Sequence, residues 1–298
     1  WRLNSGQGTM ADDQTANGNT GTLIGGTQWQ IGTTCFSSTT PLLTYVPDNN
    51  FENYLEANGM GDGIALNDSV LTANINTVTS LYVPYESIAD LTGIEGFVTL
   101  THLSCFNNQL TSLDVSNNIA LIDLNCQSNQ LTNLNVSTNT ALQHLHCDSN
   151  QLTNLNVSNN TALDYLDCGD NLLTNLDVSN NTALAYLYSH SNQLTNLNVS
   201  NNTALTYLYC TGNLLTNLDV SNNTALTYLY SHSNQLTSLD LRNGNNLNIT
   251  VLNCTNNPQL YCIDVDDATW STANWISPTN IDAQHYFSAN CSSVVFDC

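Results

Sequence analysis

The sequence predicts a repeat solenoid that is mainly β. Between residues 100 and 246, a 21-residue unit recurs seven times in unbroken register, with the frame L-x-x-L-x-C-x-x-N-x-L-T-x-L-x-V-S-x-N-x-A. A unit this short cannot bury its apolar positions alone, so each copy must stack on its neighbours. Each unit also contains the same L-x-x-L spacing twice, and each half predicts a short strand.

Strand geometry assigns a role to each position of the frame. Because alternate side chains of a strand point to opposite faces, Leu103 and Cys105 are predicted to point inward and their neighbours outward. Asn108 follows, where the chain turns, and an asparagine there can satisfy loop backbone groups. We therefore predict structural roles for the asparagines at this position in successive units: Asn108, Asn129, Asn150, Asn171, Asn192, Asn213, Asn234 and Asn257.

The repeated L-x-x-L-x-C-x-x-N resembles the leucine-rich repeat signature, with Cys at the third apolar site, and specifically the bacterial 21-residue class with nested half-repeats. The resemblance covers roughly residues 45 to 291, whose ends look like the caps of secreted flavobacterial surface proteins with leucine-rich repeats. It implies a coil of short parallel strands. It also implies a secreted or cell-surface protein that binds a protein or a glycan.

The organisation along the chain follows from this pattern. Residues 1–44 are rich in Gly, Thr and Asn, and are either an N-terminal extension or part of another β-module. Residues 45–99 are the expected N-terminal cap with an irregular first repeat, residues 100–246 hold the seven repeats, and residues 247–298 hold a last half-repeat and an irregular C-terminal cap.

The N-terminal cap is expected to contain a short helix. The segment 48–56 begins with Asp48, a good N-cap residue, and carries apolar side chains at helical spacing before Gly59 ends it. The helix is predicted to cover the first rung of the coil.

Composition excludes several classes of partner. The formal net charge is -22, the chain has no lysine, and its only basic residues besides histidine are Arg2 and Arg242. Nucleic acids and anionic membrane surfaces bind through Lys and Arg, so neither is expected as a partner. No segment approaches the roughly 20 apolar residues of a membrane span, so direct membrane insertion is not expected either.

Six of the ten cysteines occupy the inward strand position, where Cys acts as a small apolar residue. Rungs about 4.8 Å apart would also allow adjacent cysteines to pair. Cys262 and Cys291 bracket a cap with little repeat core, and we predict that they form a disulfide. The partners of Cys35 and Cys298 are left open.

The outward positions of the first-half strands carry the functional hypothesis. Seven tyrosines fall in two adjacent columns, and they suit sugar rings and protein contacts alike. Stacking that merely stabilises the sheet is the alternative. The candidate ligand-binding residues are Tyr165, Tyr186, Tyr188, Tyr207, Tyr209, Tyr228, Tyr230, His190 and His232.

The preceding rungs of the same face are acidic and contain histidine. Asp123, His144, His146 and Asp167 offer imidazole and carboxylate ligands on neighbouring rungs, so a divalent cation is a further hypothesis. A solvated acidic face is the competing interpretation, and the sequence calls for no cofactor.

The second-half strands present threonines in a regular column from Thr111 to Thr237. A regular hydroxyl ladder could order water, so an ice-binding surface is one alternative function. A structural spacer that self-associates end to end is another. No nucleophile has a base and an orienting third group, so we expect a non-enzymatic binding or adhesion module.

Overall fold

The computed structural model describes residues 10–12, 20–22 and 41–293. Cys35 and Cys298 lie outside these ranges. The chain forms two compact units, residues 1–40 and 41–298.

In the first unit, strand β1 (Met10–Asp12) pairs antiparallel with strand β2 (Thr20–Thr22). The second unit contains the repeats, and the rest of the description concerns it alone.

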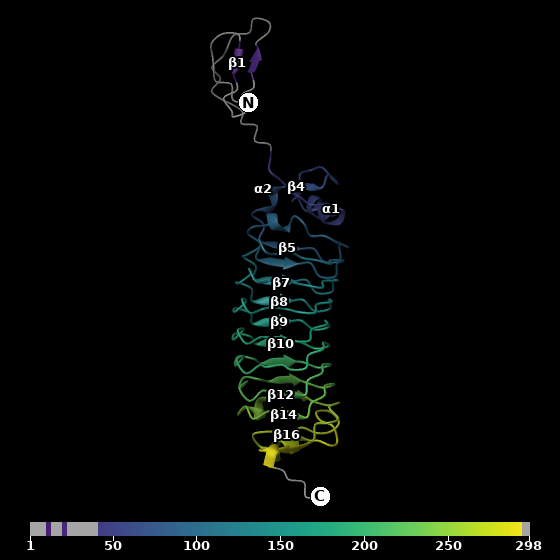
Figure 1. Cartoon of the computed structure of the whole chain (residues 1–298), viewed down its shortest axis with the longest axis vertical. Coiled ribbons are helices and arrows are strands. Elements are labelled where there is room, and N and C mark those ends of the chain that lie inside the picture. The colour runs from purple at the N-terminus through teal and green to yellow at the C-terminus, as the bar shows by residue number, and fades with distance from the viewer. Residues whose placement is uncertain (1–9, 13–19, 23–40, 294–298) are drawn as a thin grey trace. The chain divides into compact units, whose positions relative to one another are not determined.

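The second unit is a parallel β-solenoid whose rungs stack in sequence order (Figure 1). One side of the coil is a nine-stranded parallel sheet in which each rung contributes one three-residue strand. In spatial order the strands are β5 (Ser80–Tyr82), β6 (His102–Ser104), β7 (Asp123–Asn125), β8 (His144–His146), β9 (Tyr165–Asp167), β10 (Tyr186–Tyr188), β11 (Tyr207–Tyr209), β13 (Tyr228–Tyr230) and β15 (Val251–Asn253).

The strands pair without any shift in register. Leu145 of β8 lies opposite Leu124 of β7 and Leu166 of β9, and the middle residue of every strand in this sheet except β5 and β15 is a fully buried leucine. The cysteines two residues further on are also buried. The apolar core is therefore a column of leucine, cysteine and valine, as the frame predicts.

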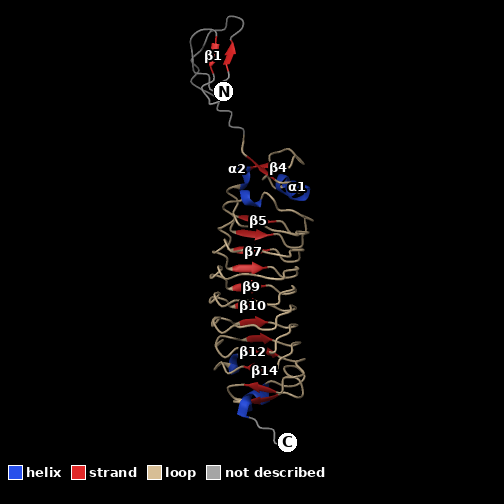
Figure 2. Ribbon diagram, viewed as in Figure 1, coloured by secondary structure: helices blue, strands red, loops and turns tan. Residues whose placement is uncertain are grey.

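A second parallel sheet forms only near the C-terminal end, where the ribbon diagram shows further strands within the coil (Figure 2). Its order is β12 (Asn217–Asp219), β14 (Ser238–Asp240), β16 (Cys262–Asp264) and β17 (Tyr286–Ser288). The prediction of a strand in every second half-repeat is thus wrong for the earlier rungs. There, single backbone bonds join successive rungs, as from Gln151 N to Leu131 O at 2.9 Å.

The first asparagine column serves the turns as predicted. The Asn171 Nδ2 donates to the carbonyl oxygens of Cys147, Cys168 and Gly169 at 3.0, 3.2 and 2.9 Å, and its Oδ1 accepts from Leu152 N at 2.9 Å. One side chain therefore satisfies four backbone groups on two adjacent rungs. The same pattern recurs from Asn129 to Asn234.

The N-terminal cap contains the predicted helix, α1 (Asn49–Ala57). Asp48 caps it by accepting from the backbone N–H groups of Asn50 and Phe51 at 2.9 and 3.0 Å. Strands β3 (Leu43–Tyr45) and β4 (Ser69–Leu71) pair antiparallel beside it, and helix α2 (Thr72–Ile75) and the 3-10 helix η1 (Ile94–Gly96) complete the cap.

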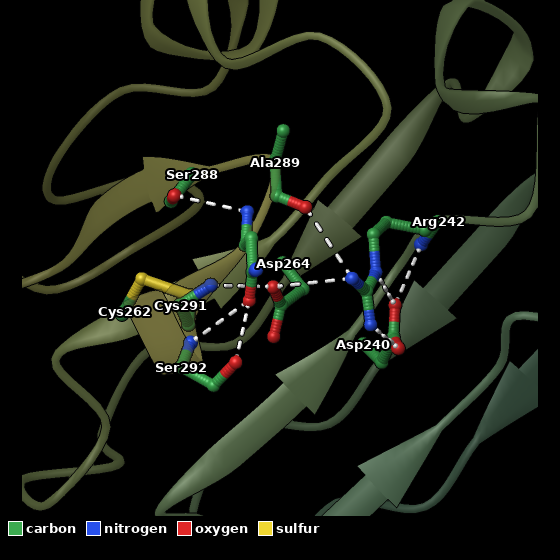
Figure 3. Close-up of a disulfide and its surroundings, with 9 residues drawn as sticks. Asp240, Arg242, Cys262, Asp264, Ser288, Ala289, Cys291 and Ser292 are labelled. Carbon is green, nitrogen blue, oxygen red and sulfur yellow. Dashed lines mark hydrogen bonds and ion pairs between the residues drawn. A yellow bond between two sulfur atoms is a disulfide. The ribbon is translucent and has the colours of Figure 1, made fainter. Parts of the chain in front are cut away.

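The C-terminal cap consists of the 3-10 helix η2 (Asn246–Asn248), helix α3 (Ala268–Asn274), strands β16 and β17, and the 3-10 helix η3 (Cys291–Ser293). Cys262 and Cys291, the pair singled out from the sequence, are joined by a disulfide (Figure 3). Arg242 lies nearby and donates to Asp240 and to the Ala289 carbonyl oxygen, with Asp264 at 3.7 Å. The disulfide and the arginine together attach the end of the chain to the last repeat.

Among the described residues, no helix has the length and apolar character needed to cross a bilayer.

Candidate ligand-binding face

The outward side chains of the nine-stranded sheet lie in straight files, because each strand pairs with its neighbour in register. Tyr165, Tyr186, Tyr207 and Tyr228 occupy the first position of β9, β10, β11 and β13. The third position of the last three of these strands carries Tyr188, Tyr209 and Tyr230. We call these seven side chains the tyrosine patch.

The rings of the tyrosine patch contact one another across rungs. Tyr207 is central, with ring centroids 4.9 Å from Tyr188, 5.3 Å from Tyr228 and 5.8 Å from Tyr230. The pairs with Tyr188 and Tyr228 are stacked, an arrangement that adds to stability beyond area burial. Both interpretations of the tyrosines are therefore compatible with the geometry, since the rings stack and also form a surface.

The patch remains open to solvent on its outer side. Tyr186 and Tyr228 are 44% and 38% exposed, and the other five rings are half-buried. Burial raises the pKa of Tyr207 to about 12, with neighbouring tyrosines adding to the effect. The Tyr207 hydroxyl therefore stays protonated at neutral pH and can both donate and accept hydrogen bonds.

His190 and His232 extend the aromatic surface, each lying two residues after a tyrosine of the patch, Tyr188 and Tyr230 respectively. His190 lies 4.6 Å from Tyr209 between ring centroids, and His232 lies 6.5 Å from the same tyrosine on the other side. Nε2 of His190 lies 3.3 Å from Asp170 Oδ2. Both candidate histidines thus lie beside the tyrosine patch, and burial lowers the pKa of His232.

The position of His190 depends on a glycine that the sequence analysis missed. A Cβ on Gly169 would lie 2.2 Å from the His190 Cε1, so the imidazole occupies the space that any other side chain would fill. The only signal in the sequence is that the equivalent position in each of the other six repeats carries a side chain: Phe106, Gln127, Asp148, His190, Thr211 and His232.

The preceding rungs carry the acidic part of the face. His144 lies between two carboxylates, with Nδ1 3.1 Å from Asp123 Oδ2 and Nε2 3.2 Å from Asp164 Oδ1. His146 instead packs on Tyr165 with ring centroids 4.6 Å apart, and burial lowers its pKa. The neutral imidazole of His146 therefore continues the aromatic surface by one rung.

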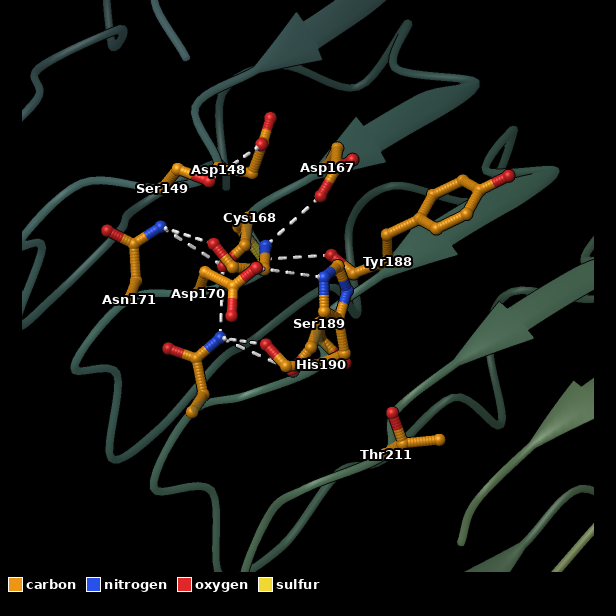
Figure 4. A network of polar contacts seen from close by, with 12 residues as sticks. Asp148, Ser149, Asp167, Cys168, Asp170, Asn171, Tyr188, Ser189, His190 and Thr211 are labelled. Carbon is orange, nitrogen blue, oxygen red and sulfur yellow. Dashed lines mark hydrogen bonds and ion pairs between the residues drawn. The ribbon is translucent and has the colours of Figure 1, made fainter. Parts of the chain in front are cut away.

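Asp148 and Asp167 are partly buried carboxylates of this face, and Figure 4 shows them beside Asp170, Tyr188 and His190. Burial raises the pKa of Asp167 to about 7, with the nearby Asp148 adding to the effect. Burial also raises the pKa of Asp148. Two partly buried carboxylates without a strong cation beside them account for both shifts.

The proposed metal ligands are not gathered into one site. Within the described ranges, no group of three or more His, Cys, Asp or Glu side chains is arranged to hold a metal ion. Asp123 contacts His144, whereas His146 turns to Tyr165 and Asp167 accepts from Gly169 N at 3.1 Å. Asp123, His144, His146 and Asp167 therefore do not converge on one point, because a ring contact and a turn bond use two of the four side chains.

The threonine column lies on a different part of the coil. Thr153, Thr174 and Thr195 and their equivalents are exposed on successive rungs. They belong to the second half of each repeat, whereas the tyrosine patch belongs to the first half. These threonines form the surface on which the ice-binding alternative depends.

The six cysteines of the core form a ladder of free, buried thiols: Cys105, Cys126, Cys147, Cys168, Cys210 and Cys254. Several donate to the next rung, as Cys147 Sγ does to the Asp167 carbonyl oxygen at 3.4 Å. Burial raises the pKa of every thiol in the ladder, so these groups pack as apolar side chains. Adjacent cysteines are not joined, although their spacing allowed it.

No protein-family profile matches the chain. Among curated proteins, it is 42% identical over 107 residues to Internalin J of Listeria monocytogenes serotype 4b (strain F2365). That match covers 36% of this chain and 11% of the relative. The chain therefore spans only a small part of that protein.

Solved structures give the same relationship. The functional domain of InlJ from Listeria monocytogenes, which includes a cysteine ladder, is 39% identical with a TM-score of 0.67, over 76% of this chain and 52% of that domain. The internalin InlF from strain 4b F2365 is 23% identical with a TM-score of 0.57, over 76% of this chain and 73% of that one, and supports the fold alone. These relatives are internalins with the leucine-rich repeat solenoid expected from the sequence.

Proposed function

We propose that this chain is a non-enzymatic, secreted or cell-surface module that binds a protein through the tyrosine patch of its parallel sheet. The observation that carries the proposal is the patch itself, seven tyrosines in register on four strands with their rings in contact, of which Tyr186 and Tyr228 are more than one-third exposed. Similarity to internalins supports a surface-binding module, although the chain spans only part of those proteins.

Rigidity is what makes this patch suitable for recognition. Five of the seven tyrosines have ring contacts with both neighbouring rungs, and Tyr228 and Tyr230 have them with β11 alone. Rings that are already held in this way lose little side-chain entropy when a partner covers them. Tyrosine combines an apolar ring with a hydroxyl, and it is enriched among the residues that contribute most to protein interfaces. The free face of the nine-stranded sheet thus offers a preorganised aromatic surface with a polar rim.

The patch is also large enough to carry binding. From β9 to β13 it spans three rung steps, or about 14 Å, and His146, His190 and His232 extend its edges. A glycan would use the same rings as stacking platforms, so the partner class must be distinguished by experiment.

The test is binding of the full chain to arrays of extracellular protein domains and of glycans. The informative variant is Tyr186→Ala with Tyr207→Ala and Tyr209→Ala, and the matched control changes Thr153, Thr174 and Thr195 to Ala. Binding to protein spots that survives in the threonine variant and is lost in the tyrosine variant supports the proposal. Binding that resists the tyrosine changes while the fold persists overturns it.

The ice-binding alternative depends on the exposed threonines. This alternative predicts thermal hysteresis from the purified chain, which should be lost when Thr153, Thr174 and Thr195 are replaced by bulky residues. End-to-end assembly expects particles longer than one chain in electron micrographs, independent of either set of substitutions.

A further inference from the structure

We propose that the segment bound on this face is a basic, arginine-bearing stretch of a protein, with its guanidinium groups on Asp148 and Asp167 and its remaining side chains along the tyrosine patch. The inference deepens the proposed function and rests on it, since it names the chemistry of the partner. It follows from charges that lack a counterpart among the described residues, from open carboxylate oxygens, and from the order of side chains along the face.

The first step is charge. Neither Asp148 nor Asp167 has a cationic group within ion-pair distance in the part of the chain that the structure describes. Arg242, the one arginine in those ranges, is engaged by Asp240 at the C-terminal cap. With a formal net charge of -22, the chain attracts basic segments over long range.

The second step is the set of acceptors left open. Asp167 Oδ1 accepts from Gly169 N at 3.1 Å, and no described donor contacts its Oδ2. Asp148 Oδ2 accepts from Gln127 Nε2 and Ser149 Oγ at 3.3 and 3.2 Å, which leaves its Oδ1. Each carboxylate is thus held in place through one oxygen and presents the other.

The third step is what lies next to these oxygens. Tyr165 precedes Asp167 by two residues on β9, and Tyr188 on β10 is the register partner of Asp167. A guanidinium is planar, can bond a carboxylate through two N–H groups and stacks on aromatic rings, whereas an ammonium is a compact point charge. The juxtaposition of half-buried carboxylates and tyrosine rings therefore favours Arg over Lys.

The length of the face sets the size of the segment. From the rung of Asp148 to that of Tyr230 there are four rung steps, or about 19 Å. An extended chain of about six residues covers this distance. A short peptide is therefore a sufficient probe.

Binding should depend on pH. The groups that face Asp167 are His146 from β8, Tyr188 from β10, and Asp148, Asp170 and His190 from the following turns. The pKa of Asp167 is raised to about 7 in the free chain, and a cation favours the ionised form. Affinity is thus full above that pH and falls as the pH drops through it.

The repeats themselves show which uncharged side chains fit these positions. Asn125 occupies the position of Asp167 on β7 and accepts from Gln127 N in the same way, and Gln127 occupies the position of Asp148. The informative variant is therefore Asp148→Gln with Asp167→Asn. The control is Asp177→Asn with Asp219→Asn, because Asn156 and Asn198 make the same turn bond elsewhere. Both variants change the net charge equally.

The experiment measures fluorescence anisotropy of labelled peptides of about eight residues, alternating Arg–Ser, Lys–Ser or Glu–Ser, with the full chain. We expect the Arg peptide to bind most tightly, and the Asp148/Asp167 variant to lose about tenfold or more in affinity while the control changes less than about twofold. Equal losses in the two variants, or no binding of the Arg peptide, overturn the inference.

The two proposals fail separately. If array binding is lost in the tyrosine variant but the affinity for the Arg peptide is unchanged in the Asp148/Asp167 variant, the proposed function stands and the inference is overturned. If binding of the Arg peptide is lost in the Asp148/Asp167 variant but array binding is unchanged in the tyrosine variant, the proposed function is overturned. The face is then a site for basic peptides that does not use the tyrosine patch.

Discussion

The imidazole of His190 lies directly over Gly169, so that a Cβ on the glycine would come within 2.2 Å of Cε1 and 2.5 Å of Nδ1. The backbone of Gly169 does not have a positive φ, so space rather than conformation requires glycine here. The contact fixes the ring between Asp170 and Tyr209 at the edge of the tyrosine patch.

Gly169→Ala should therefore move one side chain rather than unfold the repeat. We expect the His190 ring to leave its contacts with Asp170 and Tyr209, at a cost of about 1 kcal/mol in unfolding free energy. NMR chemical shifts of the imidazole and urea denaturation measure the two effects. In a His190→Ala background the same substitution should cost little, and a full cost there would contradict the assignment.

Asp167→Asn should stabilise the chain at high pH. The folded-state pKa of Asp167 is raised to about 7, so the contribution of this carboxyl to stability is fully present below its unfolded pKa and is lost as the pH rises through about 7. The variant should exceed the wild type by on the order of 2 kcal/mol above pH 7 and match it near pH 4. Denaturation curves across that range test this, and a difference that is independent of pH would argue against it.

Ser189→Cys and Ser231→Cys should each stabilise the core by about 1 kcal/mol. Both serines replace cysteine in the buried ladder, and neither Oγ has a hydrogen-bond partner. Thermal unfolding under reducing conditions measures the gain, and Cys168→Ser, the reverse change on the neighbouring rung, should cost a similar amount. Stabilisation by the reverse change would show that the serine hydroxyls are satisfied.

Arg242→Met should loosen the C-terminal cap in a pH-dependent way. The hydrogen bonds from Arg242 hold the pKa of Asp240 below its ordinary value. That stabilisation is present above the unfolded pKa of the carboxyl and is lost as the pH falls through the folded value. Hydrogen exchange in β16 and β17 should therefore accelerate at neutral pH in the variant, and the difference should shrink in acid. No acceleration at neutral pH would count against the role of the arginine.

The coil and its caps could be predicted from the sequence because the same spacing of apolar residues recurs in all seven repeats. The inward leucines and cysteines, the asparagine turns and the helix capped by Asp48 all follow from local spacing. The Cys262–Cys291 pair followed from its position around a cap with little core. The frame did not show which half-repeats form strands, because both halves carry the same apolar spacing.

The site was harder to predict, since it depends on how neighbouring rungs use each side chain. The files of tyrosines follow from register alone, but their ring contacts and partial burial do not. The four side chains of the metal hypothesis do not converge, because proximity along the sheet does not fix side-chain direction. His146 stacks on Tyr165, and Asp167 accepts from a turn N–H. The role of Gly169 is visible only once His190 is placed over it.

The central claim, that the tyrosine patch is the binding surface, is tested most directly by mapping a protein partner found on the array. Hydrogen–deuterium exchange on the complex should show protection confined to β9, β10, β11 and β13, and affinity should be lost in the Tyr186/Tyr207/Tyr209 alanine variant. Protection around Thr153, Thr174 and Thr195 instead, with affinity unchanged in the alanine variant, would contradict the account.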